Sequence, residues 1–349
     1  MARSRTVVKN LVEYVPARLA ASVARCFPAD RNQATAEFAA RCYAMCCPKR
    51  MGRASDNIMR CYPDWSAERA QRTAVASMKH LFSLALVDAI QLDRYVHPDR
   101  WWKHVDMQKA AKAVPSLQSG RPAILITGHM GNWELLGYTL SMLGVKVHAL
   151  ARPLDNPLLN RWLLGIREAW GMRILTKFGA APEMQAILKR GEHLGFIADQ
   201  NAGKRGVFVP FFGRLASAYK SIGLLAITQN VPIVVAAAFR TAPGVQYEVV
   251  VHETIEPEQW QDKDDPLYWL TARYTWSLEQ LVRQAPEQYL WIHRRWSTRP
   301  GHELKGKPVP EGLERRIRSL DWLDESAHNA IIEQSNRESN DHARSSAAC

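Results

Sequence analysis

The sequence lacks the features that mark most specialised classes of protein. Its 349 residues are 47% hydrophobic and 23% charged, which is an ordinary globular composition and excludes collagen-like, wholly disordered and disulfide-scaffold classes. No pair of its six cysteines forms a Cys-x-x-Cys, and five of them fall in a stretch that we expect to be helical. We therefore expect free thiols and a reducing compartment. The cysteines are Cys26, Cys42, Cys46, Cys47, Cys61 and Cys349.

Signals for secretion and for crossing a membrane are also scarce. Glu13, Arg18 and Arg25 interrupt what would have to be the apolar part of a signal peptide. The longest uncharged run, residues 221–239, has Pro232 and two neighbouring amides in its middle. Because a membrane span needs ~20 predominantly apolar residues, we expect a helix followed by a buried strand there instead.

Several signatures of catalysis or nucleic-acid binding are missing too. There is no Gly-x-Ser-x-Gly, His-Glu-x-x-His or Gly-x-Gly-x-x-Gly, and Pro308 stands where the phosphate-loop-like residues 301–307 would need a metal-binding hydroxyl. No zinc-finger spacing occurs, and no Lys/Arg run alternates with aromatics. In spite of a net charge of +12, we therefore expect no nucleic-acid partner.

The positive charge is concentrated near the N-terminus. The first 80 residues hold 14 basic and 6 acidic side chains, which favours an anionic partner. Within residues 1–27, aliphatic side chains recur every three or four positions among basic ones such as Arg3 and Arg5. This pattern predicts an amphipathic helix that either lies on an anionic membrane surface or packs onto the core. The apolar positions are Val8, Leu11, Val12, Val15, Leu19, Val23 and Phe27.

Residues 119–302 alternate short apolar runs with helical patterns. Runs such as 123–127 and 233–239 predict strands, and stretches such as 133–143 and 157–170 predict helices. This alternation is typical of an α/β fold with a mainly parallel sheet flanked by helices.

The remaining segments carry other patterns. Residues 28–118 read as helices only, so residues 28–302 would form one domain with a helical N-terminal region. Residues 303–349 hold 7 basic and 9 acidic side chains together with Ser, Asn and Ala. They predict a polar tail that is partly disordered after Glu333.

The segment Thr127–Leu135 carries the most informative motif. It directly follows the first predicted strand and contains His129 and Glu134 in a His-x4-Glu spacing. The spacing alone is uninformative, because a second match occurs at His328 and Glu333 in the polar tail. Context separates the two, since His129 lies at the carboxyl end of a strand, where open α/β sheets place their sites.

The chemistry of this motif depends on a local turn. On a continuous helix the two side chains would be ~500° apart, so they meet only if His129 lies in the turn and Glu134 in the first helical turn. Gly128 and Gly131 allow that turn, and Asn132 can cap the helix. Glu134 would then stay ionised and accept an imidazole N–H, leaving the other nitrogen as a general base. The alternative is a histidine satisfied in the core.

Four blocks in this order and spacing resemble the bacterial lipid A biosynthesis (lauroyl/myristoyl) acyltransferases, which belong to the lysophospholipid acyltransferase superfamily. The resemblance extends from about residue 5 to residue 302. The blocks are residues 128–134, Arg152-Pro153-x2-Asn156-Pro157 with Arg167, residues 199–213 beginning Asp199-Gln200-Asn201, and residues 286–296.

The resemblance implies a glycerolipid acyltransferase-like fold and a specific reaction. A fatty acyl chain would pass from an acyl-carrier-protein thioester to a hydroxyl of a lipid A precursor at the cytoplasmic face of the bacterial inner membrane. His129 would be the base and Glu134 its orienting partner. Arg167 would bind a substrate phosphate or the developing oxyanion, and Asp199 would hold Arg167 or shape the site. No cofactor and no metal is required.

Further residues receive weaker assignments. The remaining candidates for substrate binding are Asn132, Arg152, Lys204, Arg205, Arg294 and Arg295. Trp291 and Trp296 suit a membrane interface. Phe208, Pro210, Phe211 and Phe212 are candidates to line an acyl groove, with a buried aromatic cluster as the alternative.

Two other functions remain open. The same fold and dyad would serve an acyltransferase that modifies another lysolipid or glycolipid from acyl-CoA. A protein of a different class would bind anionic membranes through the N-terminal charge without catalysis. Several members of the family carry an N-terminal membrane span, whereas residues 1–27 are too charged for one, so we expect peripheral attachment.

Overall fold

A seven-stranded sheet forms the centre of the molecule in a computed structural model that describes residues 7–169, 171–176 and 181–347. Its strand order is β1-β9-β8-β2-β5-β3-β4, and all neighbours are parallel except β8 and β9. The predicted α/β fold with a mainly parallel sheet is therefore confirmed. The strands are β1 (Val105–Asp106), β2 (Ile124–Thr127), β3 (Val147–Ala151), β4 (Arg173–Thr176), β5 (His193–Ile197), β8 (Ile233–Ala242) and β9 (Gln246–Ile255).

Both faces of the sheet are covered, which explains why central strands such as β2 and β8 are mostly apolar. Along β8, Ile233 and Val235 point into one hydrophobic core, while Val234 and Ala236 point into the other. Helices α10 (Lys220–Gln229) and α11 (Pro266–Gln284) contribute to the first core, and α7 (Trp133–Met142) contributes to the second. The uncharged run 221–239 is thus divided between α10 and β8, as predicted, and is not one span.

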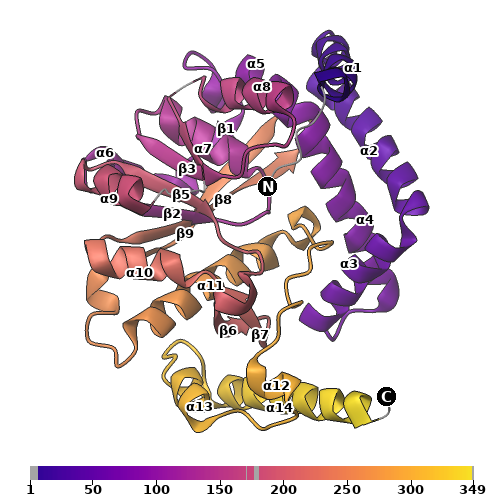
Figure 1. Cartoon of the computed structure of the whole chain (residues 1–349). Coiled ribbons are helices and arrows are strands. Elements are labelled where there is room, and N and C mark those ends of the chain that lie inside the picture. The colour runs from indigo at the N-terminus through magenta and orange to yellow at the C-terminus, as the bar shows by residue number, and fades with distance from the viewer. Residues whose placement is uncertain (1–6, 170, 177–180, 348–349) are drawn as a thin grey trace.

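The N-terminal region is built of long helices that stand beside the sheet (Figure 1). They are α1 (Val7–Arg25), α2 (Ala29–Cys46), α3 (Pro48–Cys61), α4 (Ala67–Ser83), a π-helical turn (Leu84–Asp88) and α5 (Ala89–Tyr95). The stretch Ala67–Tyr95 is the one helix of the described residues long and apolar enough to cross a membrane, by length and composition only. Here it packs against the domain, where Ser77 donates to the Tyr289 carbonyl at 2.6 Å.

Local predictions in this region were close but incomplete. Residues 28–118 are not purely helical, because the two-residue strand β1 joins the edge of the sheet beside β9. The smaller helices are α6 (Val114–Gln118), α8 (Pro157–Arg167) and α9 (Ala181–Lys189). The helix predicted over 157–170 ends at Arg167, and Trp170 lies outside the described residues. The antiparallel hairpin of β6 (Val207–Phe211) and β7 (Arg214–Ala218) was not predicted.

The polar tail, for which the sequence predicts disorder after Glu333, forms helices as far as Ala347. They are α12 (Gly301–Leu304), α13 (Glu311–Arg318) and α14 (Glu325–Ala347). Ile331 and Ile332 of α14 pack with Leu215 of β7 in a small separate core. Composition alone does not reveal this, because α14 is mostly polar and only these two large apolar side chains of it are buried in that core.

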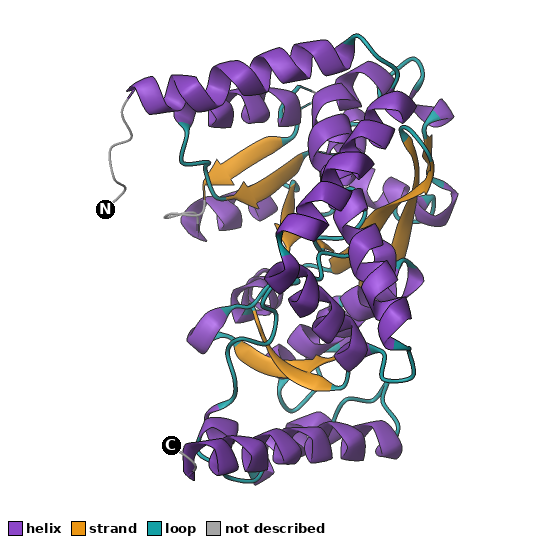
Figure 2. Cartoon of the chain, turned by 90° about the vertical axis from the view of Figure 1, so that its right-hand side faces the viewer, coloured by secondary structure: helices purple, strands orange, loops and turns teal. Residues whose placement is uncertain are grey.

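Helix α1 and the C-terminal helices lie at opposite ends of the molecule. Figures 1 and 2 show α1 beside α5 and α8 at one end, and α12 to α14 at the other, with the sheet between them. Any surface formed by α1 is therefore remote from the tail.

Candidate active site

The predicted turn between β2 and α7 is present and depends on one glycine. Gly131 has a φ of +52°, and a Cβ there would lie 2.0 Å from the Ala238 carbonyl oxygen. The Asn132 N–H donates to that same carbonyl at 2.7 Å. The Asn132 side chain caps α7 by accepting from the Leu135 N–H at 2.9 Å, as expected. Close approach of β8 therefore requires glycine at this point.

The fourth block of the resemblance lies against this turn on its other side. Residues 286–296 run beside it, with the Leu290 N–H donating to the His129 carbonyl at 3.0 Å. Met130 and Tyr289 form an isolated antiparallel bridge, and Gly131 donates to the Gln288 carbonyl at 3.0 Å. His80 of α4 bonds the Gly131 carbonyl through Nε2 at 2.9 Å. The backbone of residues 129–131 is therefore fixed by hydrogen bonds to residues 286–296 and to α4.

His129 is paired with Asp199. Its Nδ1 lies 2.8 Å from the Asp199 Oδ1, and Asp199 is only 3% exposed. Asp199 follows β5, which lies beside β2 in parallel register, with Thr127 opposite Ile197. Because parallel strands end at the same edge of a sheet, two residues distant in sequence meet there.

The electrostatics of the pair favour an ionised carboxylate. Burial lowers the pKa of His129, but the charge and hydrogen bond of Asp199, helped by the charge of Glu134, raise it above its ordinary value overall. Burial raises the pKa of Asp199, and the charge and hydrogen bond of His129 outweigh this, so the pKa is lowered overall. Gln200 places its Nε2 3.3 Å from the His129 Nε2, which fits a neutral, accepting nitrogen there.

Glu134 does not orient His129, so the predicted hydrogen bond between them is wrong. Its carboxylate forms a two-pronged ion pair with Arg167, whose Nε lies 2.8 Å from Oε2, and accepts from the Trp133 indole at 3.2 Å. The Trp133 ring packs against the imidazole, with centroids 5.1 Å apart. The expected pairs were Glu134 with His129 and Asp199 with Arg167. In the structure Asp199 contacts His129 and Glu134 contacts Arg167.

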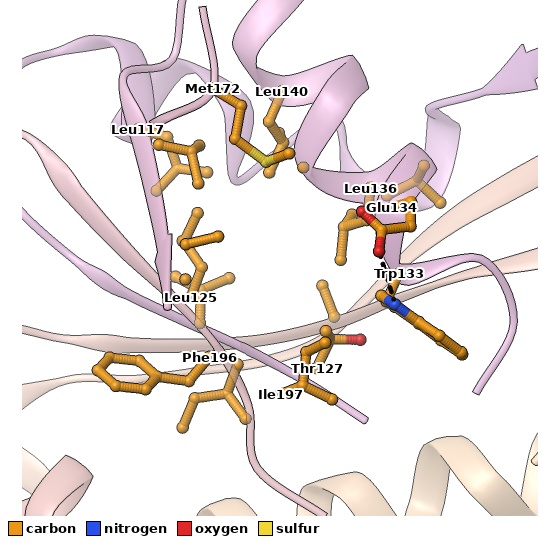
Figure 3. A pocket seen from close by; sticks show the side chains of 18 of the residues that line it. Leu117, Leu125, Thr127, Trp133, Glu134, Leu136, Leu140, Met172, Phe196 and Ile197 are labelled. Atoms are coloured by element: carbon orange, nitrogen blue, oxygen red, sulfur yellow. Dashed lines mark hydrogen bonds between the residues drawn. The ribbon is translucent and has the colours of Figure 1, made fainter. Parts of the chain in front are cut away.

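An apolar cavity of about 100 Å³ opens beside this ion pair. Figure 3 shows Trp133 and Glu134 at one end of it, with Leu117 of α6 and Phe196 of β5 toward the other. The lining is almost wholly hydrocarbon, which suits an apolar chain rather than a polar head group. Nothing in the sequence singles out Phe196 as a lining residue, since the pattern of its strand is that of an ordinary core strand.

A buried polar cluster behind α7 was also missed. Asp88 is 1% exposed, and its Oδ2 accepts from Arg240, Tyr247 and Asn132. Burial raises the pKa of Asp88, although the charge of Arg240 and the hydrogen bond from Tyr247 oppose this. Asn132 thus supports the turn rather than offering its amide to a substrate. No motif links these four residues, which come from four separate elements.

Other predicted residues lie on the surface. The Arg152 side chain is 78% exposed and lies 3.7 Å from Asp155. Lys204 and Arg205 are exposed on a short 3₁₀ helix between the end of β5 and the hairpin. The structure brings none of these three side chains into contact with His129.

The second aromatic block is part of the core. Trp291 and Trp296 are buried, so their proposed place at a membrane interface is wrong. Arg295 is also buried, where it donates to the Ser217 carbonyl and lies over the Phe211 ring, whereas Arg294 is exposed. Phe211 and Phe212 join this cluster, which confirms the alternative interpretation of a buried aromatic group.

Cysteine and metal chemistry are not assembled at this site. The five cysteines that the structure describes are free thiols, and Cys349 lies outside the described residues. Among the residues with assigned positions, no group of three or more His, Cys, Asp or Glu side chains could hold a metal ion.

Taken together, a histidine held by a buried carboxylate at the carboxyl edge of a parallel sheet, next to an apolar cavity, defines an α/β enzyme for a substrate with a hydrocarbon chain. Residues 12–298 match the bacterial lipid A biosynthesis acyltransferase family, and the chain belongs to that family. Family membership makes it an acyltransferase, as predicted.

Three relatives illustrate the match. The chain is 26% identical over 257 residues to a lipid A biosynthesis lauroyltransferase of Escherichia coli (strain K12), covering 70% of this chain and 78% of the relative. A lipid A biosynthesis palmitoleoyltransferase of the same strain is 24% identical over 255 residues, covering 72% and 80%. A lipid A biosynthesis acyltransferase of Haemophilus influenzae is 24% identical over 262 residues, covering 73% and 78%.

Proposed function

We propose that this protein transfers a fatty acyl chain from a thioester to a hydroxyl of a lipid A precursor. The observation that carries the proposal is the His129 and Asp199 pair, whose imidazole packs against Trp133, a residue in the wall of an apolar cavity. The family supports acyl transfer, and the names of the relatives support lipid A as the acceptor.

His129 would act as the general base. With Nδ1–H donating to Asp199, Nε2 is free to take the proton of the acceptor hydroxyl, displacing the Gln200 amide. The acceptor oxygen attacks the thioester carbonyl, the carbon–sulfur bond breaks, and His129 returns the proton to the leaving thiolate. Asp199 would stabilise the imidazolium that exists between these two proton transfers. It would thus take the place beside His129 that the resemblance assigns to Glu134.

Glu134 would position Arg167 instead. The ion pair uses Nε and Nη2 of the guanidinium, so Nη1 is left to meet the substrate phosphate or the developing oxyanion. The chain of the donor would lie in the cavity beside this pair. Lys204 and Arg205 keep their proposed role toward anionic substrate, now as exposed groups that a bound lipid or carrier would have to reach.

The donor would be acyl carrier protein, as the resemblance implies, and a net charge of +12 is compatible with this acidic partner. Acyl-CoA with another lysolipid or glycolipid is the second candidate. We propose no cofactor.

Attachment would be peripheral, at the cytoplasmic face of the inner membrane, through α1. The helix turns its aliphatic side outward, with Val12 66% and Leu19 63% exposed. Its polar side meets the domain, where Arg25 pairs with Asp93 at 2.9 Å and Glu13 accepts from Asn156 at 3.0 Å. An exposed apolar helix face at one end of the molecule suits an interfacial helix. Arg3 and Arg5, which would add charge, lie outside the described residues.

The test compares cells and purified protein with and without His129→Ala. Mass spectrometry of cellular lipids identifies both the acyl chain and the acceptor, and assays with acyl carrier protein and acyl-CoA identify the donor. We expect His129→Ala to lower turnover by roughly 10²–10⁴-fold, the usual contribution of a positioned base, while binding to anionic vesicles is unchanged. Turnover that survives the substitution would remove His129 from the mechanism, and a lack of thioester consumption with every lipid hydroxyl would exclude acyl transfer.

A further inference from the structure

A second, larger cavity lies on the other side of the Glu134 and Arg167 ion pair. Its volume is about 590 Å³, and it is enclosed by α1, α2, the helix Ala67–Tyr95 and α8. Helix α1 contributes only alanines to its wall, namely Ala17, Ala20, Ala21 and Ala24. Larger side chains at these four positions would fill the space under α1, whereas alanines leave it empty.

The two cavities converge next to His129. Trp133, Glu134 and Arg167 line both of them, and the Trp133 ring lies against the His129 imidazole. A chain in either cavity would therefore end at the same three residues. The positions of the cavities differ, since the smaller one lies between α7 and the sheet and the larger one lies under α1.

The wall of the larger cavity is mostly hydrocarbon. Besides the alanines of α1, it is formed by Leu81 and Leu92 of the helix Ala67–Tyr95 and by Leu159 and Leu163 of α8. Asp88 also lines it, but that side chain is only 1% exposed and its Oδ2 bonds Arg240 and Tyr247. The cavity is thus suited to a hydrocarbon chain.

Helix α1 stands between this cavity and the outer surface at its end of the molecule. The wall of the cavity is one side of α1, and the exposed aliphatic residues Val12, Leu19 and Val23 lie on the other. Figure 2 shows α1 running along the edge of the molecule above the rest of the domain. A chain leaving a bilayer would meet apolar surface on both sides of this helix.

We propose that the cavity beneath α1 binds a hydrocarbon chain of the acceptor lipid, while the smaller cavity holds the chain of the donor. This assignment rests on the proposed acyl transfer. The acceptor is a membrane lipid and arrives from the bilayer, whereas the donor is presented by a water-soluble carrier. The helix with the outward aliphatic face therefore borders the acceptor's cavity.

A kinetic test introduces a bulky side chain into the larger cavity and measures the KM for each substrate. Ala21→Phe places an aromatic ring in this cavity, and Leu224→Phe adds similar bulk at a 50% exposed position of α10, which lines neither cavity. With acyl carrier protein carrying a lauroyl chain as donor and a purified lipid A precursor as acceptor, Ala21→Phe should raise the KM for the acceptor about tenfold or more, because buried methylenes are displaced. The KM for the donor should stay within about twofold, and Leu224→Phe should change neither. A rise in the donor KM alone would overturn the assignment.

A second measurement does not depend on turnover or on a folded variant. Wild-type protein is photolysed with vesicles of phosphatidylglycerol that contain phosphatidic acid with a diazirine in one acyl chain. Labelled peptides should map to α1 and α8, around Ala21 and Leu163, whereas a diazirine-bearing lauroyl chain on acyl carrier protein should label residues near Leu117 and Phe196. Lipid labelling near Phe196 and not on α1 or α8 would overturn the proposal. Labelling reports on the cavity even if no acyl transfer occurs, so the proposed function and this inference can fail separately.

Discussion

Asp199 and Glu134 are both carboxylates close to His129, yet they act on it in different ways. Asp199 makes the direct 2.8 Å contact with Nδ1, whereas Glu134 acts on His129 through its charge alone and makes its hydrogen bonds to Arg167 and Trp133. A hydrogen bond fixes the tautomer and orientation of an imidazole, and a more distant charge does not. The structure therefore gives the contact with the proposed base to Asp199 and the contact with Arg167 to Glu134.

This separation predicts different pH profiles for two matched amide substitutions. Since Asp199 raises the pKa of His129, activity should fall as the pH drops through a pKa above the ordinary histidine value. Asp199→Asn removes that stabilisation, so the acidic limb of kcat/KM should move to lower pH and the plateau should fall by on the order of 10²-fold. Glu134→Gln should move the limb less.

The measurement is kcat/KM as a function of pH for both variants and the wild type. Equal displacement by both substitutions would mean that Glu134 orients the base after all. A lowered plateau with an unmoved limb in Asp199→Asn would leave Asp199 a structural role only.

Among the elements, α1 has the least usual orientation. The polar side of an amphipathic helix usually faces water, but Arg25 and Glu13 of α1 face the domain and its aliphatic side faces outward. Periodicity could not decide this, because the same pattern fits a helix that packs inward. Only the positions of α5 and α8 decide which side is free.

The aliphatic face predicts membrane binding that depends on a few side chains. Val12→Glu with Leu19→Glu should lower the partition coefficient onto phosphatidylglycerol vesicles by about tenfold or more, through lost apolar contact and charge repulsion. The melting temperature should be unchanged, since both side chains are exposed. Vesicle sedimentation measures the partition, and calorimetry measures the melting temperature.

A matched control places the same charges elsewhere. Leu224 of α10 and Leu304 of α12 are 50% and 49% exposed, and α12 lies at the opposite end of the molecule (Figure 1). Leu224→Glu with Leu304→Glu should leave the partition nearly unchanged. Equal loss in both double variants would show that net charge, and not α1, governs binding.

At the scale of the whole molecule, α14 packs against the β6–β7 hairpin at the end of the molecule remote from α1. Glu338 of α14 pairs with Arg214 of β7 and with Arg299, and Arg299 also pairs with Glu303. These side chains are less than one fifth exposed, so their charges depend on one another rather than on water. The tail therefore belongs to the folded unit although its composition is polar.

This network predicts a stability effect without a catalytic one. Glu338→Gln should lower the free energy of unfolding by about 1–3 kcal/mol, because two partly buried guanidinium groups lose a partner. Burial raises the pKa of Glu338, but hydrogen bonds from Arg214 and Gln334 lower it overall, so its contribution is present above the ordinary glutamate pKa and is lost as the pH falls through the lowered value.

Denaturant unfolding near neutral and at acidic pH checks both statements. Glu333→Gln on the exposed side of α14 is the control and should change stability little. A loss of kcat/KM in Glu338→Gln at temperatures where the protein is folded would mean that the tail communicates with the site.

Much of the local structure was determined by the sequence itself. The strand before His129, the glycine turn and the Asn132 cap depend on neighbouring residues, and each was predicted before any contact was known. The alternation of strands and helices likewise gave the α/β class, because apolar periodicity reflects which sides of an element are buried. The four blocks with their spacing gave the family.

The partners within the site were decided only by the tertiary structure. His129 and Asp199 are 70 residues apart in the sequence, and they meet because β5 pairs with β2. This strand order depends on packing across the whole sheet. The same holds for α1, whose outward side depends on α8, and for α14, whose few apolar residues are buried only against the hairpin. Sequence spacing constrains what one element can reach, whereas contacts between elements depend on how their surfaces fit together.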